Sequence, residues 1–575
     1  MIGVAKRPSK LAFTLGRFAG FLKLLFRNGK SLAGLTIIAI FCVLAVVPQW
    51  FTPFNNLGQD ITERGFPLAG GSTAPVWLRY IPAWLGGKPT LSENMYVFQN
   101  PGYPKLRRDD GELNFTIDGS GIVINESDAN YPYVQPRGFL KFAEPGSLNV
   151  TFSREEGILY NESRVIIFKE FDFPYLGVPS RFYGNIELLV KGTVDVKGEL
   201  DAPVKVTVFL GPVGGRMWRL WPPPNNPIED SRVPRGFTRD LVTGQPGPIV
   251  KPEYGALVWD NASYTWVDRG WITSVSTDIS VIDSESNSVV NAKTDFGRPP
   301  NRPVPMVFTS VPGKYIYGVE MIFSDRKNSS KPVSTSVFID DFGLILFGTS
   351  FGFMGTDHHG QDLFAQLIYG TRISIYLGVM VAVLSVTIGL AIGLTAGYMG
   401  RVVDELLMRF TDILLMLPGL PLLVVLVAVL GATIDNLIIL LGLLGWMGFA
   451  RMVRSQVLSL KERPFVEAAK AVGAGRFHII VSHVVPSVMP LIYISLAMAV
   501  PGAVTAEAAL SWLGFYDPFR MSWGRMLNAF FEANATTNWW WVVPPGACIA
   551  ALAAAFVLLG YALDEVLNPK LRQRR

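Results

Sequence analysis

Long apolar runs restrict the fold of this chain more than any other feature of its sequence. A helix that crosses a bilayer core needs about 20 predominantly apolar residues. Only 17% of the residues are charged, against about 25% in an average soluble protein. Six runs reach or approach the length of a span: Leu32–Trp50, Ile373–Met399, about Leu414–Ala432, Leu437–Phe449, about Val485–Leu510 and Trp541–Leu563. The sequence therefore predicts an α-helical membrane protein with six transmembrane helices.

Lysine and arginine indicate on which side of the membrane the chain ends lie. Residues 1–30 contain seven of them and no acid, and the last six residues contain four more. Basic segments next to a span usually lie in the cytoplasm, so we prefer this interpretation to a nucleic-acid-binding arm. The first apolar run is too long for a signal peptide and lacks an A-x-A cleavage site. We therefore expect a multi-pass plasma-membrane protein with both termini in the cytoplasm.

A long polar segment with a different periodicity separates the first and second apolar runs. It contains short β-branched and aromatic stretches with turn residues between them, such as RVIIFKEF, PVKVTVFLG and YIYGVEMIF. This pattern predicts an antiparallel β-sandwich, jelly-roll-like, and counting the spans places it outside the cell. Four tryptophans in it are able to stack on sugars, although core packing is their more common use in a sandwich: Trp218, Trp221, Trp266 and Trp271.

These patterns together predict the organisation of the whole chain. The expected parts are a cytoplasmic basic N-terminus (1–30), a first transmembrane helix (31–51), an extracellular inserted β-rich domain (61–348), a five-helix core (350–564) that includes a cytoplasmic loop (455–486), and a cytoplasmic C-terminus (565–575).

The loop between the fourth and fifth runs contains the stretch EAAKAVGAGRFHIIVSHVVP, which begins at Glu467 and ends at Pro486. Helical spacing predicts a short helix that ends near Gly473, a turn through Gly475, and a second amphipathic segment. The stretch resembles the E-A-A-x-x-x-G signature of ABC importer permeases, with Glu467, Ala468, Ala469, Gly473 and Pro486 in register. His483 stands where many permeases have isoleucine, a departure common in the oligopeptide/dipeptide/nickel branch.

Other segments extend the resemblance to this branch, and the first run with FTPFN after it is similar to the N-terminal anchor of its second-permease type. GTDHHGQD, EAALSWLGF and SWGRML occur in the expected order around the later runs. The first of these motifs leads into the second span, and its matching residues are Gly355, Thr356, Asp357, Gly360 and Asp362. Gln361 replaces the usual arginine, which weakens any charge role at that position. A short outer loop is usual before this motif, so the large insertion is a departure from the family pattern.

The resemblance implies a type I importer permease fold and a coupling loop that docks on a cytoplasmic ATPase, with Glu467 pairing a basic group there. It implies four kinds of partner: a homologous second permease, two ABC ATPase subunits, an extracellular solute-binding protein and membrane lipid. The expected cargo is oligopeptides or dipeptides. An oligosaccharide importer of the same family is the alternative. A surface receptor or adhesin is disfavoured, because an anchor needs no ATPase dock.

The remaining candidate residues point to transport and not to catalysis. Pro418 and Gly419 interrupt the third run, and such breaks occur where helices line a cavity. Glu507 is an acid near the outer end of the fifth run, which marks it for a pathway role, for solvation at the interface, or for pairing with Arg525. The sequence N-G-K-S at 28–31 imitates a Walker A motif but lacks its first glycine. We therefore expect no catalytic or metal site and no bound cofactor, with ATP and Mg on the partner subunits.

Overall fold

The computed structural model describes residues 29–59, 68–97, 113–127, 147–156, 162–193, 202, 204–221, 256–260, 265–267, 272–273, 282–283, 303–325 and 332–567. The chain divides into two compact units. The helical unit comprises residues 1–58 and 362–575, and the β unit comprises residues 59–361. Most of the expected cytoplasmic termini, residues 1–28 and 568–575, lie outside the described part.

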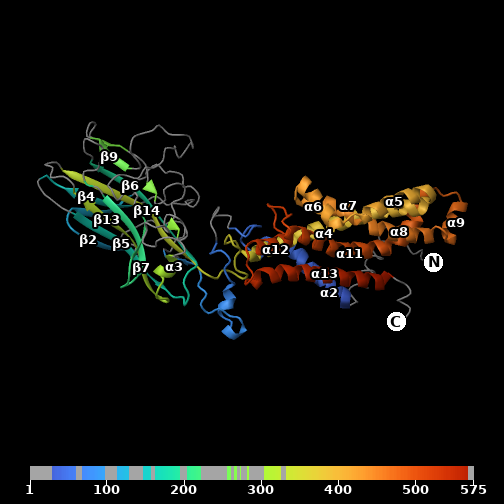
Figure 1. Cartoon of the computed structure of the whole chain (residues 1–575), viewed down its shortest axis with the longest axis horizontal. Helices are drawn as coiled ribbons and strands as arrows, with labels where there is room; N and C mark the ends of the chain where they lie inside the picture. Colours follow the sequence, from blue (N-terminus) through green and yellow to red (C-terminus); the bar gives the residue numbers. More distant parts are fainter. Residues whose placement is uncertain are drawn as a thin grey trace, which may run out of the picture. The chain divides into compact units, whose positions relative to one another are not determined.

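The helical unit is a bundle of apolar helices joined by short connections (Figure 1). Its elements are α2 (Gly29–Val46), the 3-10 turn η1 (Pro48–Trp50), α4 (Leu363–Met399), α5 (Arg401–Met416), α6 (Gly419–Leu430), α7 (Ile434–Gly445), α8 (Met447–Leu460), α9 (Pro464–Ala471), α10 (Arg476–Ile479), the π-helical turn η6 (Ile480–Val484), α11 (Val485–Trp512), α12 (Trp523–Glu532) and α13 (Trp539–Leu567).

Five helical segments of the described chain are long and apolar enough to cross a membrane, and a bent pair makes a sixth if it counts as one span. The pair is α5 and α6, whose axes differ by 85°. The third span, expected over about Leu414–Ala432 with an interruption at Pro418 and Gly419, is this bent pair, and the chain breaks at Leu417 and Pro418. The fourth is longer than Leu437–Phe449, since α7 and α8 together run over Ile434–Leu460.

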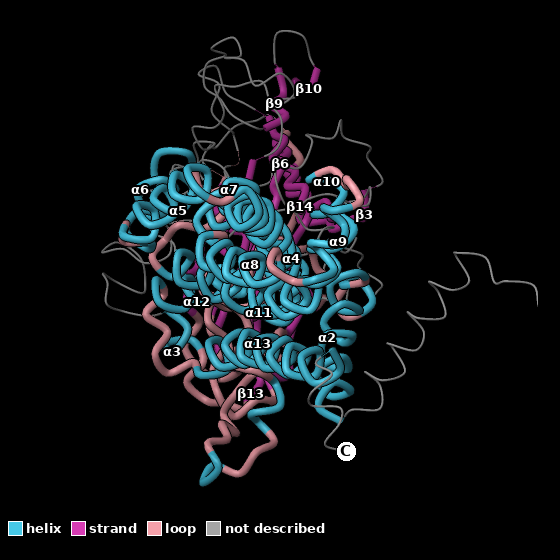
Figure 2. The backbone as a smooth tube through the Cα atoms, turned by 90° about the vertical axis from the view of Figure 1, so that its right-hand side faces the viewer, coloured by secondary structure: helices cyan, strands magenta, loops and turns pink. Residues whose placement is uncertain are grey.

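Glycines allow α4 to pack closely against α7 and α8. Gly389, Gly393 and Gly397 recur every fourth residue and share one face of α4. A Cβ at Gly393 would lie 2.6 Å from the Ala450 carbonyl oxygen, and one at Gly397 would lie 2.8 Å from the Val457 Cβ. Small residues at such spacing let membrane helices approach until their backbones touch. Figure 2 shows α4 and α8 side by side within the bundle.

The β unit contains two sheets, which run across its centre in Figure 1. The nine-stranded sheet has the order β10 (Thr265–Val267), β9 (Ala256–Asp260), β6 (Arg181–Thr193), β14 (Val333–Phe347), β4 (Ser147–Arg154), β3 (Ile122–Ser127), with β1 (Met95–Tyr96) on β14 and β11 (Ile272–Thr273) and β12 (Ile282–Asp283) on β6. The five-stranded sheet has the order β2 (Asn114–Asp118), β5 (Glu162–Phe173), β13 (Gly313–Ser324), β7 (Val204–Pro212), β8 (Trp218–Trp221).

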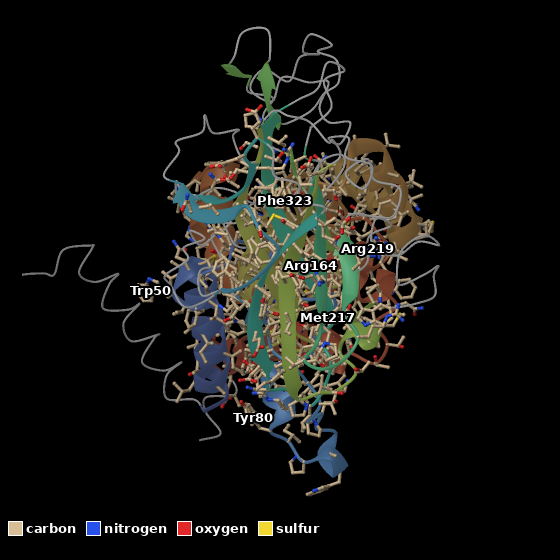
Figure 3. The ribbon with its side chains drawn as sticks, turned by 90° about the vertical axis from the view of Figure 1, so that its left-hand side faces the viewer. Trp50, Tyr80, Arg164, Met217, Arg219 and Phe323 are labelled. Atoms are coloured by element: carbon tan, nitrogen blue, oxygen red, sulfur yellow. The ribbon has the colours of Figure 1, made fainter. Side chains whose placement is uncertain are left out.

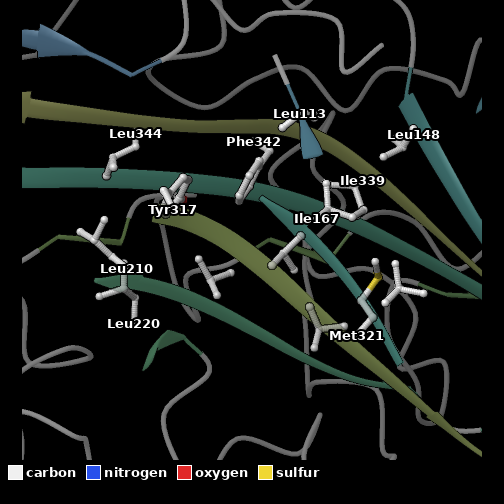
Figure 4. Close-up of a cluster of buried hydrophobic side chains, with 14 of the residues drawn as sticks. Leu113, Leu148, Ile167, Leu210, Leu220, Tyr317, Met321, Ile339, Phe342 and Leu344 are labelled. Carbon is white, nitrogen blue, oxygen red and sulfur yellow. The ribbon is translucent and has the colours of Figure 1, made fainter. Parts of the chain in front are cut away.

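The two sheets share one hydrophobic core, so the β unit is a sandwich (Figure 4). Inward residues alternate with outward ones along each strand, as in β13, where Tyr315, Tyr317 and Met321 are fully buried. The Tyr317 ring stacks on Phe342 of the other sheet with centroids 4.6 Å apart. The described pairings are antiparallel except for β6 with β9. A jelly-roll connection order remains a prediction.

Aromatic side chains test the sugar-binding alternative only in part. Trp218 is buried in the sandwich core, and the Arg216 guanidinium lies 3.9 Å from its ring centroid. Its indole face is therefore used for packing. The side chains of Trp221 and Trp266, and the whole of Trp271, lie outside the described residues.

Candidate functional site

The loop that contains the E-A-A sequence begins with α9. The helix starts at Pro464, which follows Arg463 in an extended conformation. Proline at the first helical position loses no hydrogen bond, because that N–H has no partner inside a helix. Glu467 lies in the first turn, where an acid interacts favourably with the helix dipole. The sequence therefore fixes the N-terminus of α9 and places Glu467 beside it.

Gly473 ends α9 in a Schellman motif. The N–H of Ala474 donates to the Ala469 carbonyl at 3.1 Å, and the N–H of Gly473 donates to the Lys470 carbonyl at 2.9 Å. A Schellman motif requires a residue in the left-handed conformation directly after the helix end, and Gly473 has φ of +86°. Ala469 and Ala474 pack against the hydrophobic core below. The turn between the two short helices is thus defined by backbone geometry and held by two small side chains.

The second arm of the loop passes from α10 through η6 into α11. Pro486 lies in the first turn of α11, and it has no N–H to donate to the carbonyl four residues earlier. The N–H of Val485 instead donates to the Ile480 carbonyl, which is the i to i−5 bond of a π-turn. Proline therefore accounts for the local widening of the helix at this position.

The loop has one buried face and one exposed face. Val466, Ile479 and Val484 are buried against α8 and α11. On the other side Glu467 and Ala468 are exposed, together with Phe465, Val472, Phe477 and Val481, of which Val472 is 89% and Phe477 80% exposed. Figure 1 shows α9 at the end of the helical unit opposite α12. We call these six residues the exposed face of the loop. It combines an acid with apolar side chains that the chain leaves uncovered.

The segment Gly355–Gly360 forms a turn in the β unit that is held by the neighbouring residues 70–73. The Thr356 hydroxyl donates to the Gly70 carbonyl at 2.7 Å and accepts from the Thr73 N–H at 3.0 Å. Asp357 accepts from the N–H groups of His359 and Gln361, each at 2.9 Å. These bonds give Thr356 and Asp357 structural roles. In the described residues no three His, Cys, Asp or Glu side chains are placed to hold a metal ion.

Asp362 caps α4 at the start of the second span. Its carboxylate accepts from the Ala365 N–H at 2.7 Å, and its own N–H donates to the Gly58 carbonyl at 2.9 Å. The cap satisfies a helical N–H that would otherwise lack a partner. The second bond joins the residue before the β unit to the residue after it.

Glu507 is buried at the C-terminal end of α11, with 1% of its surface exposed. Its carboxylate oxygen Oε1 accepts from the hydroxyls of Ser511 at 2.8 Å and Ser522 at 2.6 Å. The Arg525 guanidinium instead donates to the Asp517 and Arg520 carbonyls and lies over the Tyr516 ring. Glu507 is therefore neither solvated at the interface nor paired with Arg525.

The break in the third span coincides with its two prolines and the glycine between them. Pro418 precedes α6 in an extended conformation and Gly419 is its first residue. Both residues are exposed, and a Cβ at Gly419 would contact nothing within 4 Å. At the 85° bend, the described part of this chain therefore leaves Pro418 and Gly419 uncovered.

Two ion pairs between α5 and α8 were not predicted from the sequence. Arg454 donates to both carboxylate oxygens of Asp404, at 2.5 and 2.7 Å, and Arg451 pairs with Asp412. Residue spacing is the sequence signal for these ion pairs. The two arginines lie three residues apart and the two acids eight apart, so the arginines share one face of α8 and the acids share one face of α5.

The fold defines a multi-pass helical membrane protein, and the loop is a paired-helix connection with one exposed face. A family model described as "Binding-protein-dependent transport system inner membrane component" matches residues 389–573. The dipeptide transport system permease protein DppC of Bacillus subtilis is 38% identical over 221 residues, which is 38% of this chain and 69% of the relative. The chain belongs to this family, as a permease subunit of an ABC importer.

Other relatives match a similar share of this chain. The oligopeptide transport system permease protein OppC of Bacillus subtilis is 37% identical, over 38% of this chain and 72% of its own. The glutathione transport system permease protein GsiD of Pectobacterium atrosepticum is 32% identical, over 38% of this chain and 73% of its own. A solved structure of the MetNI methionine ABC transporter covers 35% of this chain and 94% of its own at 18% identity, with a TM-score of 0.28. Permease subunits carry no ATPase activity, which resides in separate subunits.

Proposed function

We propose that this chain is a permease subunit of an ABC importer that takes up dipeptides or oligopeptides. The relatives named above are permeases for dipeptides, oligopeptides and glutathione, so they support a peptide cargo and give the oligosaccharide alternative no support. The observation that carries the coupling role is the exposed face of the loop. In it Glu467 and four apolar side chains are held on a turn whose backbone is fixed by Gly473.

In this proposal the exposed face docks on an ABC ATPase subunit. An ionised Glu467 accepts hydrogen bonds from a basic group of that subunit. Phe477 and Val472 make apolar contacts with the subunit around Glu467. Ala468 allows close approach, because its side chain ends at Cβ. The buried residues Val466 and Ile479 tie the dock to the bundle, so that movement of the ATPase is passed to α8 and α11 as a rigid-body shift.

The rest of the assembly follows from the same family membership. A second homologous permease, two ATPase subunits and a solute-binding protein complete the transporter. Both termini then lie in the cytoplasm, and the β unit lies on the outer face, where the binding protein delivers cargo. Pro418 and Gly419 border the translocation path at the bend, and Glu507 fixes the outer end of α11.

Charge reversal in the exposed face tests the dock. Glu467→Lys is to be compared with Glu532→Lys, which makes the same change at an exposed residue of α12, at the other end of the helical unit (Figure 1). The assembled transporter is reconstituted in vesicles, and ATP-dependent uptake of a labelled peptide is measured. A lost charge-assisted hydrogen bond costs about 1.5–3 kcal/mol, so uptake should fall roughly tenfold or more for Glu467→Lys and little for the control.

Two results would overturn these assignments. Equal uptake by the two variants would remove the docking role of Glu467. Competition for uptake by oligosaccharides but not by unlabelled peptides would replace the cargo class while leaving the dock intact.

A further inference from the structure

A loop of the β unit carries large aromatic side chains that the described chain leaves mostly exposed. We call residues 76–90 the aromatic loop. It contains the 3-10 turns η2 (Val76–Arg79) and η3 (Ala83–Leu85). Trp84 is 82% exposed and Tyr80 72% exposed, and Pro82 and Ala83 between them are also exposed. In Figure 3 the loop projects away from the two sheets, with Tyr80 near its base.

The aromatic loop has a defined conformation, which hydrogen bonds, a buried side chain and an ion pair hold in place. The Lys88 N–H donates to the Leu78 carbonyl at 2.9 Å, and the Gly87 N–H donates to the Pro82 carbonyl at 3.2 Å. Leu78 is buried under it, and Gly86 supplies a left-handed residue with φ of +86°. Arg79 pairs with Glu93 at 2.6 Å, and its hydrogen bond to the Tyr80 hydroxyl raises the pKa of the guanidinium. The chain therefore holds Trp84 and Tyr80 outward at the cost of leaving their rings in contact with solvent.

The base of the loop is fixed to the segment that leads into the membrane. The Ala74 N–H donates to the Thr349 carbonyl and the Phe351 N–H to the Ala74 carbonyl, each at 2.9 Å. The Val76 N–H donates to the Gly352 carbonyl at 3.1 Å. From there the chain runs to Asp362, the cap of α4. Even a fully extended connection between Phe351 and Asp362 measures no more than about 40 Å, so the base of the loop lies within that distance, along the chain, of the start of α4.

The helical unit carries exposed tryptophans at the end where α4 begins. Within it, Asn56 donates to the Phe519 carbonyl at 3.1 Å, so the attachment of the β unit lies beside the loop that joins α11 to α12. At this end Trp50 follows α2, Trp512 ends α11 and Trp539 begins α13, and they are 80%, 39% and 49% exposed. Tryptophan and tyrosine concentrate at the headgroup level of a bilayer, where one part of the ring system is in contact with lipid and its polar atom with water.

We propose that the aromatic loop binds the lipid headgroup layer of the membrane. Trp84 and Tyr80 enter the interface, and the exposed Lys88 faces lipid phosphates. The proposal requires the helical unit to cross the bilayer, and it holds whichever side of the membrane the β unit occupies. Failure of the peptide-import proposal would therefore leave it standing.

The test measures the depth of the loop in the full-length chain. Cys42 and Cys548, the free cysteines, are replaced by serine and alanine, and Trp84→Cys is labelled with a fluorophore. The protein is placed in nanodiscs of phosphatidylcholine and phosphatidylglycerol that contain spin-labelled phosphatidylcholine. The matched control is Ile117→Cys in β2, which is 45% exposed and lies at the end of the sandwich away from the loop (Figure 1). Ala83→Cys, which keeps Trp84, is the second variant.

We expect the spin-labelled lipid to reduce fluorescence by roughly half at positions 84 and 83 and to leave position 117 unchanged. Aqueous iodide should quench position 117 more strongly than position 84. The proposal is overturned if iodide quenches positions 84, 83 and 117 alike and the lipid quenches none of them. It is also overturned if position 84 is shielded only when a purified solute-binding protein is added, because the loop would then be a protein-docking surface.

Discussion

The Glu507 carboxylate accepts a hydrogen bond from the Ser522 hydroxyl at 2.6 Å, which joins the end of α11 to the start of α12. The same hydroxyl oxygen accepts from the Arg525 N–H at 3.1 Å and so caps α12. Ser511 supplies a second donor to Glu507 at 2.8 Å. Gly524 leaves the space that the carboxylate needs, since a Cβ there would lie 3.0 Å from Oε1. One acid and two serines thus fix the position of α12 against α11.

Ser522→Ala should destabilise the helical unit by about 2–3 kcal/mol. The variant loses the cap of α12, which is worth about 1 kcal/mol, and removes a donor from a buried carboxylate. Thermal unfolding of the purified permease in nanodiscs measures the effect. Thr505→Ala is the control, because its hydroxyl bonds within α11 to the Pro501 carbonyl at 2.8 Å and is exposed. Equal losses in the two variants would contradict the special role of Ser522.

The sequence alone singles out this acid but not its partners. Glu507 stands out because acids are rare within apolar runs, whereas Ser511 and Ser522 resemble any other serine until α12 folds back on α11. Likewise the prolines at 418 and 421 predicted an interrupted third span, while the 85° bend there is a tertiary result. Gly473 was found because a left-handed helix end favours one residue type. Features that depend on local backbone conformation can be predicted from a sequence. Side-chain pairing between elements that are distant in the sequence cannot.

Arg454→Ala should weaken the contact between α5 and α8. Asp404 is 14% exposed and would lose two charge-assisted hydrogen bonds, a cost of about 1.5–3 kcal/mol. Arg409→Ala is the matched control on α5, because its pair with Glu405 at 3.8 Å is 76% and 71% exposed and should contribute about 0–1 kcal/mol. Thermal unfolding of both variants in nanodiscs gives the comparison. If Arg409→Ala lowers the stability as much as Arg454→Ala does, the Arg454–Asp404 pair contributes no more than an exposed ion pair.

Asp325→Ala should destabilise the β unit by about 3–5 kcal/mol, because it leaves the Arg154 charge buried without its partner. The Arg154 Nε lies 2.5 Å from Asp325 Oδ2, the two side chains are 0% and 2% exposed, and they join β4 of one sheet to the end of β13 in the other. Protease susceptibility of the β unit in the full chain reports the change. Asp172→Ala is the control, since its pair with Lys314 at 3.9 Å is exposed. The double variant Arg154→Met with Asp325→Leu should recover most of the loss, and its failure to do so would argue against an electrostatic cause.

Gly473→Ala should reduce coupled transport while the permease remains folded. Alanine at φ of +86° pays a backbone penalty of about 1–2 kcal/mol, and relief of that strain rotates α10 relative to α9 and displaces Phe477 from Glu467 on the exposed face. Gly475→Ala is the matched control two residues away, because Gly475 has φ of −66° and a Cβ there also meets nothing within 4 Å. The measurements are ATP-dependent peptide uptake and the amount of ATPase that co-purifies. Both should fall for Gly473→Ala and stay near the unmodified level for Gly475→Ala. If both variants transport normally, the angle set at Gly473 does not matter for docking; if both fail equally, space at the turn, and not its left-handed geometry, is what the ATPase requires.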